Sequence, residues 1–142
     1  CDIVSEAKET LLISLWAEEL EEIKAFLPDK NIKTAIVHFG KTDFKFEKTF
    51  IHPIEDTIYD EKKGRGFVIV KDSKEVLIGT IDNDKNIEGA HSANKAFVTI
   101  AEDYIKHDIY IMKIVSRFND LLIEKFGDNY KELRDIFNDK SF

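Results

Sequence analysis

Residues 67 to 81, Phe-Val-Ile-Val-Lys-Asp-Ser-Lys-Glu-Val-Leu-Ile-Gly-Thr-Ile, decide the fold. Two apolar runs rich in β-branched residues, 67–70 and 76–81, flank the turn-forming residues 71–74, a pattern that predicts a β-hairpin. The first run is apolar at every position, so both faces of its strand are apolar. Such strands are typical of a sheet that is covered on both sides, or of a sheet with one face against a partner.

A second hairpin is predicted upstream, because residues 32–39 and 44–52 alternate between apolar and polar positions. The connection at residues 40–43 suits a turn, and closing it symmetrically pairs Ile36 with Phe46 and Ile32 with Phe50. Residues 53–65 then form a charged connection, in which we expect Tyr59 to serve as a contact residue.

Helices are predicted on either side of these hairpins. Residues 5–27 carry apolar residues at helical spacing, with four glutamates on the other side and Pro28 at the end. Residues 93–107 form a second helix, and a third begins near residue 113 and ends at Gly127; residues 109–115 fit strand or helix. A short helix follows, with Asp128 as its cap.

The predicted fold class is therefore α+β: an N-terminal helix, an antiparallel four- to five-stranded sheet built from two hairpins, and C-terminal helices. Residues 1–142 make a single globular domain, because this length suits one domain and 43% hydrophobic residues suffice for a core. This order of elements is similar to the architecture of PAS-like and roadblock-like modules.

The charge of the chain is unevenly distributed. The formal net charge is -7, and residues 1–30 hold eight acids and three lysines, whereas residues 31–71 hold six acids and eight basic residues. The basic residues are interleaved with acids, which disfavours nucleic-acid binding. A protein partner with a basic surface fits better, and we expect it to meet the glutamates Glu18, Glu19, Glu21 and Glu22.

The single cysteine, Cys1, excludes an internal disulfide, and no run approaches the roughly 20 apolar residues that cross a bilayer. We expect a cytoplasmic protein. The alternative is an extracytoplasmic lipoprotein anchored through a lipid on Cys1. Self-association into a homo-oligomer is left open.

The polar segment 79–96 is the candidate site. Its carboxylates Asp82, Asp84 and Glu88 are candidate ligands for calcium or magnesium, which favour clustered oxygen donors. The spacing from Asp84 follows the first half of an EF-hand loop, but Lys95 stands where a bidentate Glu is needed. Alternatively, the Asn and Asp residues are turn formers and Ser92 caps the following helix.

Residues 80–84, Thr-Ile-Asp-Asn-Asp, resemble a loop of phosphofructokinases that also joins a strand to a helix. The resemblance implies that Asp82 is a general base towards a sugar hydroxyl and that Asp84 lies near metal-bound phosphates. It covers about six residues, and the chain is too short for that two-domain enzyme and lacks its upstream Gly-Gly-Asp phosphate loop.

Three functions follow from these patterns. The first is a small, acidic, non-enzymatic binding or regulatory module that engages a protein partner, as an inhibitor or immunity protein does, without a cofactor. The second is a sensor of a small ligand or a divalent cation, with a pocket between the sheet and segment 79–96. The third is an enzyme that acts on a phosphorylated substrate through Asp82. The chain has no other recognisable catalytic set, which favours the first two.

Overall fold

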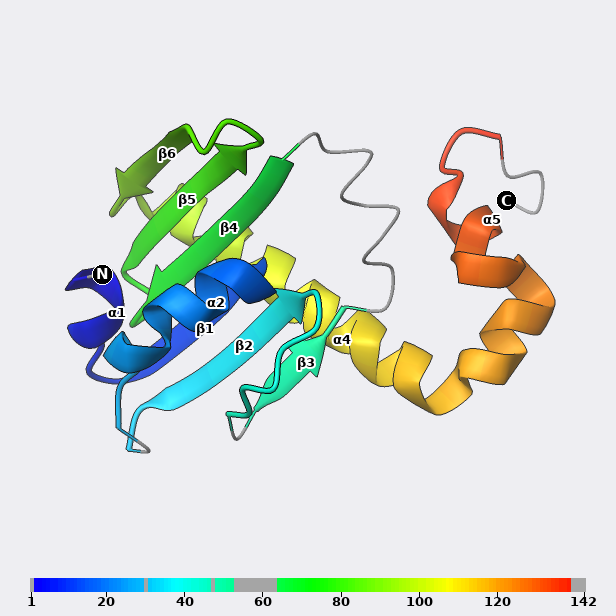
Figure 1. Ribbon diagram of the computed structural model, residues 1–142, viewed down its shortest axis with the longest axis horizontal. Helices are drawn as coiled ribbons and strands as arrows, with labels where there is room; N and C mark the ends of the chain where they lie inside the picture. Colours follow the sequence, from blue (N-terminus) through cyan, green and yellow to red (C-terminus); the bar gives the residue numbers. More distant parts are fainter. Residues whose placement is uncertain (1, 30, 47, 53–63, 139–142) are drawn as a thin grey trace.

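The computed structural model describes residues 2–29, 31–46, 48–52 and 64–138. These residues form an α+β fold around a six-stranded mixed sheet, with helices at both ends of the chain (Figure 1). The strand order is β3-β2-β1-β4-β5-β6. The strands are β1 (Thr10–Trp16), β2 (Lys33–Phe39), β3 (Thr49–Ile51), β4 (Gly64–Lys71), β5 (Glu75–Asp82) and β6 (Ile87–Ser92). The helices are α1 (Asp2–Ser5), α2 (Ala17–Ile23), α4 (Lys95–Phe126) and α5 (Lys131–Arg134), with single helical turns at Lys24–Phe26 and Asp128–Tyr130.

The predicted helix over residues 5–27 is wrong, because a central strand occupies its middle. β1 pairs in parallel with β2 and antiparallel with β4, and α2 follows it directly. Its sequence, TLLISLW, is apolar at nearly every position and therefore satisfies helical and strand spacing alike. Burial of both faces against neighbouring elements favours the strand.

The predicted hairpin over residues 32–52 is wrong in its second half. β2 forms where expected, but its neighbour β3 is short and runs parallel to it, with Ile36 beside Thr49 and Val37 beside Phe50. The predicted pairs of Ile36 with Phe46 and Ile32 with Phe50 therefore do not form. The sheet is mixed and has six strands, in contrast to the antiparallel sheet of four to five strands that the sequence predicts.

The hairpin over residues 67–81 is confirmed, and it extends further than expected. β4 and β5 pair antiparallel from Gly64–Asp82 to Lys71–Glu75. A sixth strand, β6, then pairs with β5 and occupies part of the connection that we expected to be irregular. The cap of the helix beyond lies two residues later than expected, because the side chain of Asn94, not Ser92, accepts a hydrogen bond from the Ala96 N–H at 2.9 Å.

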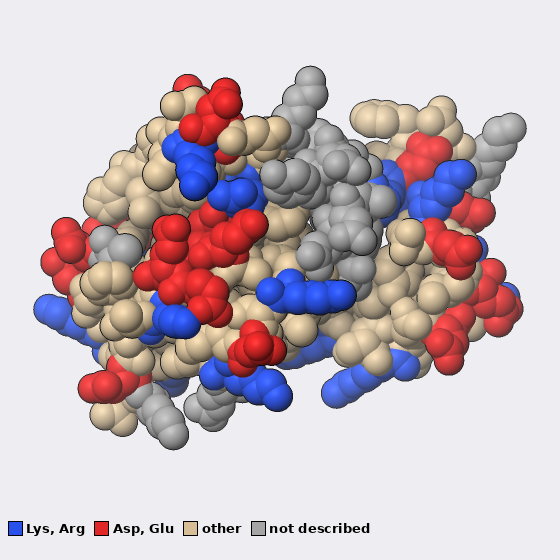
Figure 2. Space-filling view, in the orientation of Figure 1, with Lys and Arg blue, Asp and Glu red and all other residues tan. Residues whose placement is uncertain are grey.

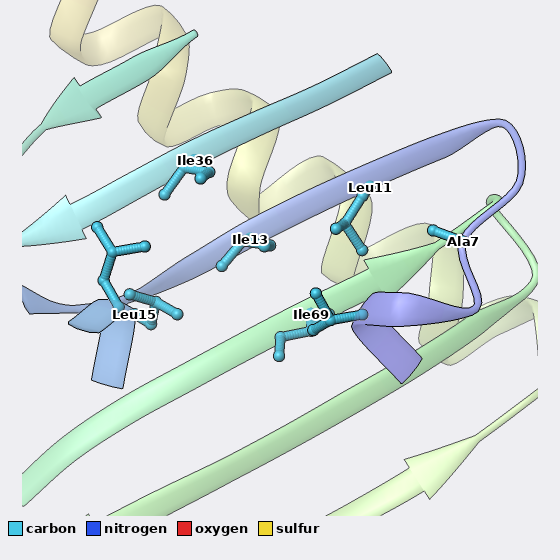
Figure 3. Close-up of a cluster of buried hydrophobic side chains, with 8 residues drawn as sticks. Ala7, Leu11, Ile13, Leu15, Ile36 and Ile69 are labelled. Carbon is cyan, nitrogen blue, oxygen red and sulfur yellow. The ribbon is translucent and has the colours of Figure 1, made fainter. Parts of the chain in front are cut away.

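The two faces of the sheet bury two separate clusters. On one face, side chains from β1, β2 and β4 pack with α1 and α2; Figure 3 shows Ala7, Leu11, Ile13, Leu15, Ile36 and Ile69 from this cluster. On the other face, Val37, Val70 and Val76 pack against the buried side of α4. The faces thus differ in their cover, with two short helices on one and one long helix on the other (Figure 1).

α4 is continuous where the sequence left strand and helix open. Residues 109–115 are helical, and the expected helix end at Gly127 is confirmed by its φ of 75° and by its N–H, which donates to the Ile123 carbonyl. A kink at Phe118 (φ -122°, ψ 22°) turns the last part of the helix away from the sheet (Figure 1). Among the described ranges, no helix combines the length and apolar character that crossing a bilayer requires.

Candidate functional site

A cavity of about 410 Å³ lies on the α4 face of the sheet, at the carboxyl end of β1. Its lining residues come from β1, β2, β4, β5 and α4: Ser14, Trp16, Phe39, Gly64, Gly66, Phe67, Val68, Ile78, Gly79, Thr80, Ile81, Asp82 and Tyr104. Ligand pockets typically enclose about 300–1,000 Å³ and are mostly apolar with a few polar groups. The cavity has the size and composition of a small-molecule site.

Two glycines of β4 open this cavity. Val68 packs on the α4 side, and side chains alternate along a strand, so Gly66 and Gly64 lie on the same face as Val68 but fill no space there. A Cβ on Gly66 would meet only the Gly79 carbonyl oxygen, at 3.9 Å. The floor of the cavity is therefore bare backbone, with room above Gly66.

Aromatic rings form one wall of the cavity. Trp16 at the end of β1 stacks on Phe39 at the end of β2, with 5.1 Å between ring centroids, and Phe39 stacks on His52 at 4.4 Å. The parallel pairing of β1 with β2 sets Trp16 directly beside Phe39. A flat apolar ring can stack against such a surface.

Hydroxyls are among the polar groups that line the cavity. Ser14 is 2% exposed, and its hydroxyl hydrogen-bonds the hydroxyl of Tyr104 on α4. Burial and the Asp108 carboxylate raise the pKa of Tyr104 above its usual value, against the opposing effect of the Ser14 hydrogen bond. The phenol is therefore neutral near pH 7 and can donate or accept a hydrogen bond.

The acids predicted to bind a cation lie at one corner of this cavity and beyond it. Asp82 lines the cavity, but its carboxylate accepts hydrogen bonds from the Asp84 N–H, the Asn86 N–H and the Asn86 side chain at 2.8–2.9 Å. The Asn86 side chain, then its N–H, lowers the pKa of Asp82 below its usual value. Asp82 thus closes the β5–β6 turn, and a less basic carboxylate is a poorer general base.

Glu88 lies on β6 opposite Thr80, away from the turn that holds Asp84. Within the described ranges, no three His, Cys, Asp or Glu side chains group as metal ligands would. The calcium or magnesium site at Asp82, Asp84 and Glu88 stays a prediction.

The predicted acidic surface lies on and next to α2, and Figure 2 shows acidic side chains gathered there. Two of its glutamates are engaged: Arg65 Nε lies 3.0 Å from Glu18 Oε2 and 2.8 Å from Glu19 Oε1. Glu21 pairs with Lys24 and accepts a hydrogen bond from the Thr42 hydroxyl at 2.7 Å. Glu22 is exposed. Tyr59, the other predicted contact residue, lies outside the described residues.

A groove of about 490 Å³ adjoins this acidic surface. Its floor consists of apolar side chains of β4, β5 and β6, and its ends are α1 and α2. Polar side chains line its edge: Asp2, Glu6, Glu19, Glu22, Lys71, Glu75 and His91. The groove therefore combines an apolar floor with a mainly acidic edge.

The sequence patterns did not locate the cavity on the α4 face, although they named its Gly79–Asp82 corner. The missing information is the long-range pairing that brings Ser14, Phe39 and Tyr104 together. One local signal was present, since glycines two positions apart in a strand, Gly64 and Gly66, leave one face without side chains.

Comparison with known proteins gives one informative match. No model of a known protein family matches the chain. The chain is 29% identical over 135 residues to the uncharacterized protein YrhO of Bacillus subtilis (strain 168), an alignment that covers 93% of this chain and 49% of YrhO. The chain thus spans about half the length of this relative.

Proposed function

We propose that this domain is a non-enzymatic regulatory module that binds a small, uncharged, ring-containing molecule in the cavity on the α4 face. The observation that carries the proposal is the combination of a glycine floor, an aromatic wall at Trp16 and Phe39, and the hydroxyls of the buried Ser14 and of Tyr104, which line the cavity. The aromatic wall supplies a stacking surface, and the hydroxyls select polar groups at the ligand's edge.

The chemistry of the lining favours an uncharged ligand. The carboxylate that reaches the cavity, Asp82, already accepts three hydrogen bonds in its own turn. No Lys or Arg is among the lining residues that the structure describes. A charged ligand would lose its hydration without gaining an ionic partner, which costs several kcal/mol.

Tryptophan fluorescence tests the proposal directly, because Trp16 is the only tryptophan of the chain and lines the cavity. The probes are uncharged cyclic metabolites and their carboxylated analogues at millimolar concentration. We expect a subset of the uncharged compounds to change the Trp16 emission with saturable dependence on concentration, and the carboxylated analogues to bind more weakly.

The variant Gly66→Val places a branched side chain in the cavity, at a position where its Cβ has room, and should abolish the change in emission. Ala96→Val is the matched control, because it adds a branched side chain at an exposed position of α4 that does not line the cavity. Equal binding by wild type and Gly66→Val, or no response to any compound, would overturn the proposal.

A second proposal, for a protein partner, is supported by the groove between α1, α2 and the outer strands. Its apolar floor and acidic edge suit a partner that inserts an apolar side chain flanked by lysines or arginines. Glu22 is exposed at this edge. In a pull-down from source cells, we expect the wild type to capture a protein that the Glu22→Lys variant no longer captures. The Glu124→Lys variant, which is changed at the distal end of α4, should capture it as the wild type does. If the Glu22→Lys variant captures the protein equally well, the groove is excluded as its binding site.

A further inference from the structure

α4 carries a second apolar stripe that lies largely exposed among the residues that the structure describes. The buried stripe, Val98, Ala101, Ile105, Ile109 and Met112, packs on the sheet. The other stripe consists of apolar side chains that are each 40–69% exposed: Phe97, Ile100, Tyr104, Ile111, Ile114 and Phe118. We call this set the outer stripe.

The spacing of the outer stripe is that of a coiled-coil seam. Its residues follow one another at intervals of three and four, with His107 at the position between Tyr104 and Ile111. Alternating intervals of three and four define the a and d positions of a heptad repeat, which pack into a partner helix. The stripe ends at Phe118, where the helix kinks, so it lies on the straight part of α4.

The exposed area of the outer stripe suits an interface. At roughly 150–250 Å² for a whole aromatic side chain and somewhat less for an aliphatic one, the exposed fractions correspond to on the order of 600 Å² of largely apolar surface. A standard interface buries about 800 Å² on each partner, so the stripe and its flanks reach this size.

We propose that two copies of this chain associate through their outer stripes, with the two α4 helices antiparallel. In this register Ile100 faces the partner's Phe118, Tyr104 faces the partner's Ile114, and His107 faces the partner's Ile111. The arrangement has a twofold axis, so each contact occurs twice.

The charges beside the stripe select the antiparallel orientation. Asp103 and Arg117 flank the stripe on the side away from the sheet, and both are exposed. In the antiparallel register Asp103 of each copy lies beside the partner's Arg117. A parallel pair would place Asp103 beside the partner's Asp108, a repulsive contact between like charges.

Sedimentation equilibrium of the chain over a range of concentrations tests whether the outer stripe is a dimer interface. We expect a dimer for the wild type and a dissociation constant at least about a hundredfold weaker for Ile100→Lys. Thr99→Lys is the matched control, because it places the same side chain on an exposed position of α4 outside the stripe, and should leave the dimer intact. Circular dichroism checks that both variants are folded. A monomeric wild type, or a dimer insensitive to Ile100→Lys, would overturn the proposal.

Charge exchange tests the orientation. Asp103→Arg alone should weaken the dimer by about tenfold, because each copy then sets a second guanidinium beside the partner's Arg117, and Arg117→Asp should weaken it similarly by pairing two carboxylates. The double variant should regain most of the affinity. A tighter dimer for Asp103→Arg would instead indicate the parallel arrangement and overturn the antiparallel one.

Discussion

The Asp72 carboxylate, in the β4–β5 turn, accepts a hydrogen bond from the Glu9 backbone N–H at the entrance to β1, with 2.7 Å between Oδ1 and the nitrogen. The N–H groups of Lys8 and Thr10 donate to the same carboxylate at 2.9–3.1 Å. Asp72 N–H donates in turn to the Thr10 carbonyl at 2.8 Å. One turn residue thus holds the start of the central strand.

Replacing Asp72 should therefore destabilise the whole domain. Asp72→Ala removes an ionised acceptor of three hydrogen bonds and should lower the free energy of unfolding by about 1–3 kcal/mol. Asp72→Asn should lower it less, because the amide retains one acceptor oxygen and Asn tolerates the φ of 53° found here. Urea denaturation measures both. Asp84→Ala, in the exposed β5–β6 turn, is the control and should change stability by less than about 0.5 kcal/mol.

The same carboxylate should make stability depend on pH. Partial burial raises the pKa of Asp72, but the backbone donors Thr10, Glu9 and Lys8 together lower it below its usual value. The ionised Asp72 carboxylate contributes its full stabilisation above the unfolded-state pKa. This contribution is lost as the pH falls through the lower folded-state pKa. The stability difference between wild type and Asp72→Asn should therefore shrink from about pH 5 downwards. A difference that is constant from neutral to acid pH would contradict this prediction.

Gly79 should tolerate no side chain, because the Phe67 ring covers it. A Cβ at this position would overlap the ring and lie 2.9 Å from the Glu88 carbonyl oxygen. Gly79→Ala should cost about 1–3 kcal/mol, and Phe67→Leu in the same chain should recover part of that loss. A double-mutant cycle, measured by thermal or chemical denaturation, gives the coupling free energy between the two substitutions. Strictly additive effects on stability would refute the predicted clash between residue 79 and the Phe67 ring. Gly66→Ala, which has room for its methyl group, should be nearly neutral.

Tyr104 belongs both to the cavity and to the outer stripe, so ligand binding and dimerisation should be linked. The compound that changes the Trp16 emission most should shift the dimer dissociation constant, and dimerisation should shift the ligand affinity by the same factor. Sedimentation equilibrium with and without that compound measures the shift. Tyr104→Phe, which lacks the hydroxyl that hydrogen-bonds Ser14, should reduce it. Identical dimer affinities in both conditions would show that the two sites are independent.

Residues 128–134, which follow the kinked helix α4, should unfold locally without unfolding of the sheet. The Tyr130 hydroxyl donates to Asn119 Oδ1 at 2.5 Å, and this segment contacts mainly α4. Asn119→Ala should accelerate amide hydrogen exchange within residues 128–134 and leave that of β1 unchanged. Faster exchange in β1 would mean that the segment stabilises the whole domain.

Local patterns predicted those elements whose partners are near in sequence. The β4–β5 hairpin, the turn at residues 71–74 and the helix end at Gly127 follow from turn chemistry and alternation over a few residues. Local patterns did not predict β1 and β3, because the pairing of these strands depends on strands elsewhere in the chain. In addition, an apolar run such as TLLISLW fits the helical and the strand period equally well.

The candidate site was predictable to a similar extent. The polar corner Gly79–Asp82 is visible in the sequence, whereas the aromatic wall requires the parallel pairing that sets Trp16 beside Phe39. The glutamates of the α2 surface are visible in the sequence, but their ion pairs with Arg65 join residues more than 40 positions apart. Spacing within one segment carries no information about such a partner.

The central place of β1 has a consequence for the time course of folding. β1 leaves the ribosome before the other five strands, yet its antiparallel neighbour β4 begins about 50 residues later. At roughly 5–20 residues per second, β1 waits several seconds for that neighbour, whereas β5 and β6 are each complete soon after the preceding strand with which they pair. The strand that ends up most deeply enclosed in the sheet is thus the one that nascent-chain chaperones can contact for longest.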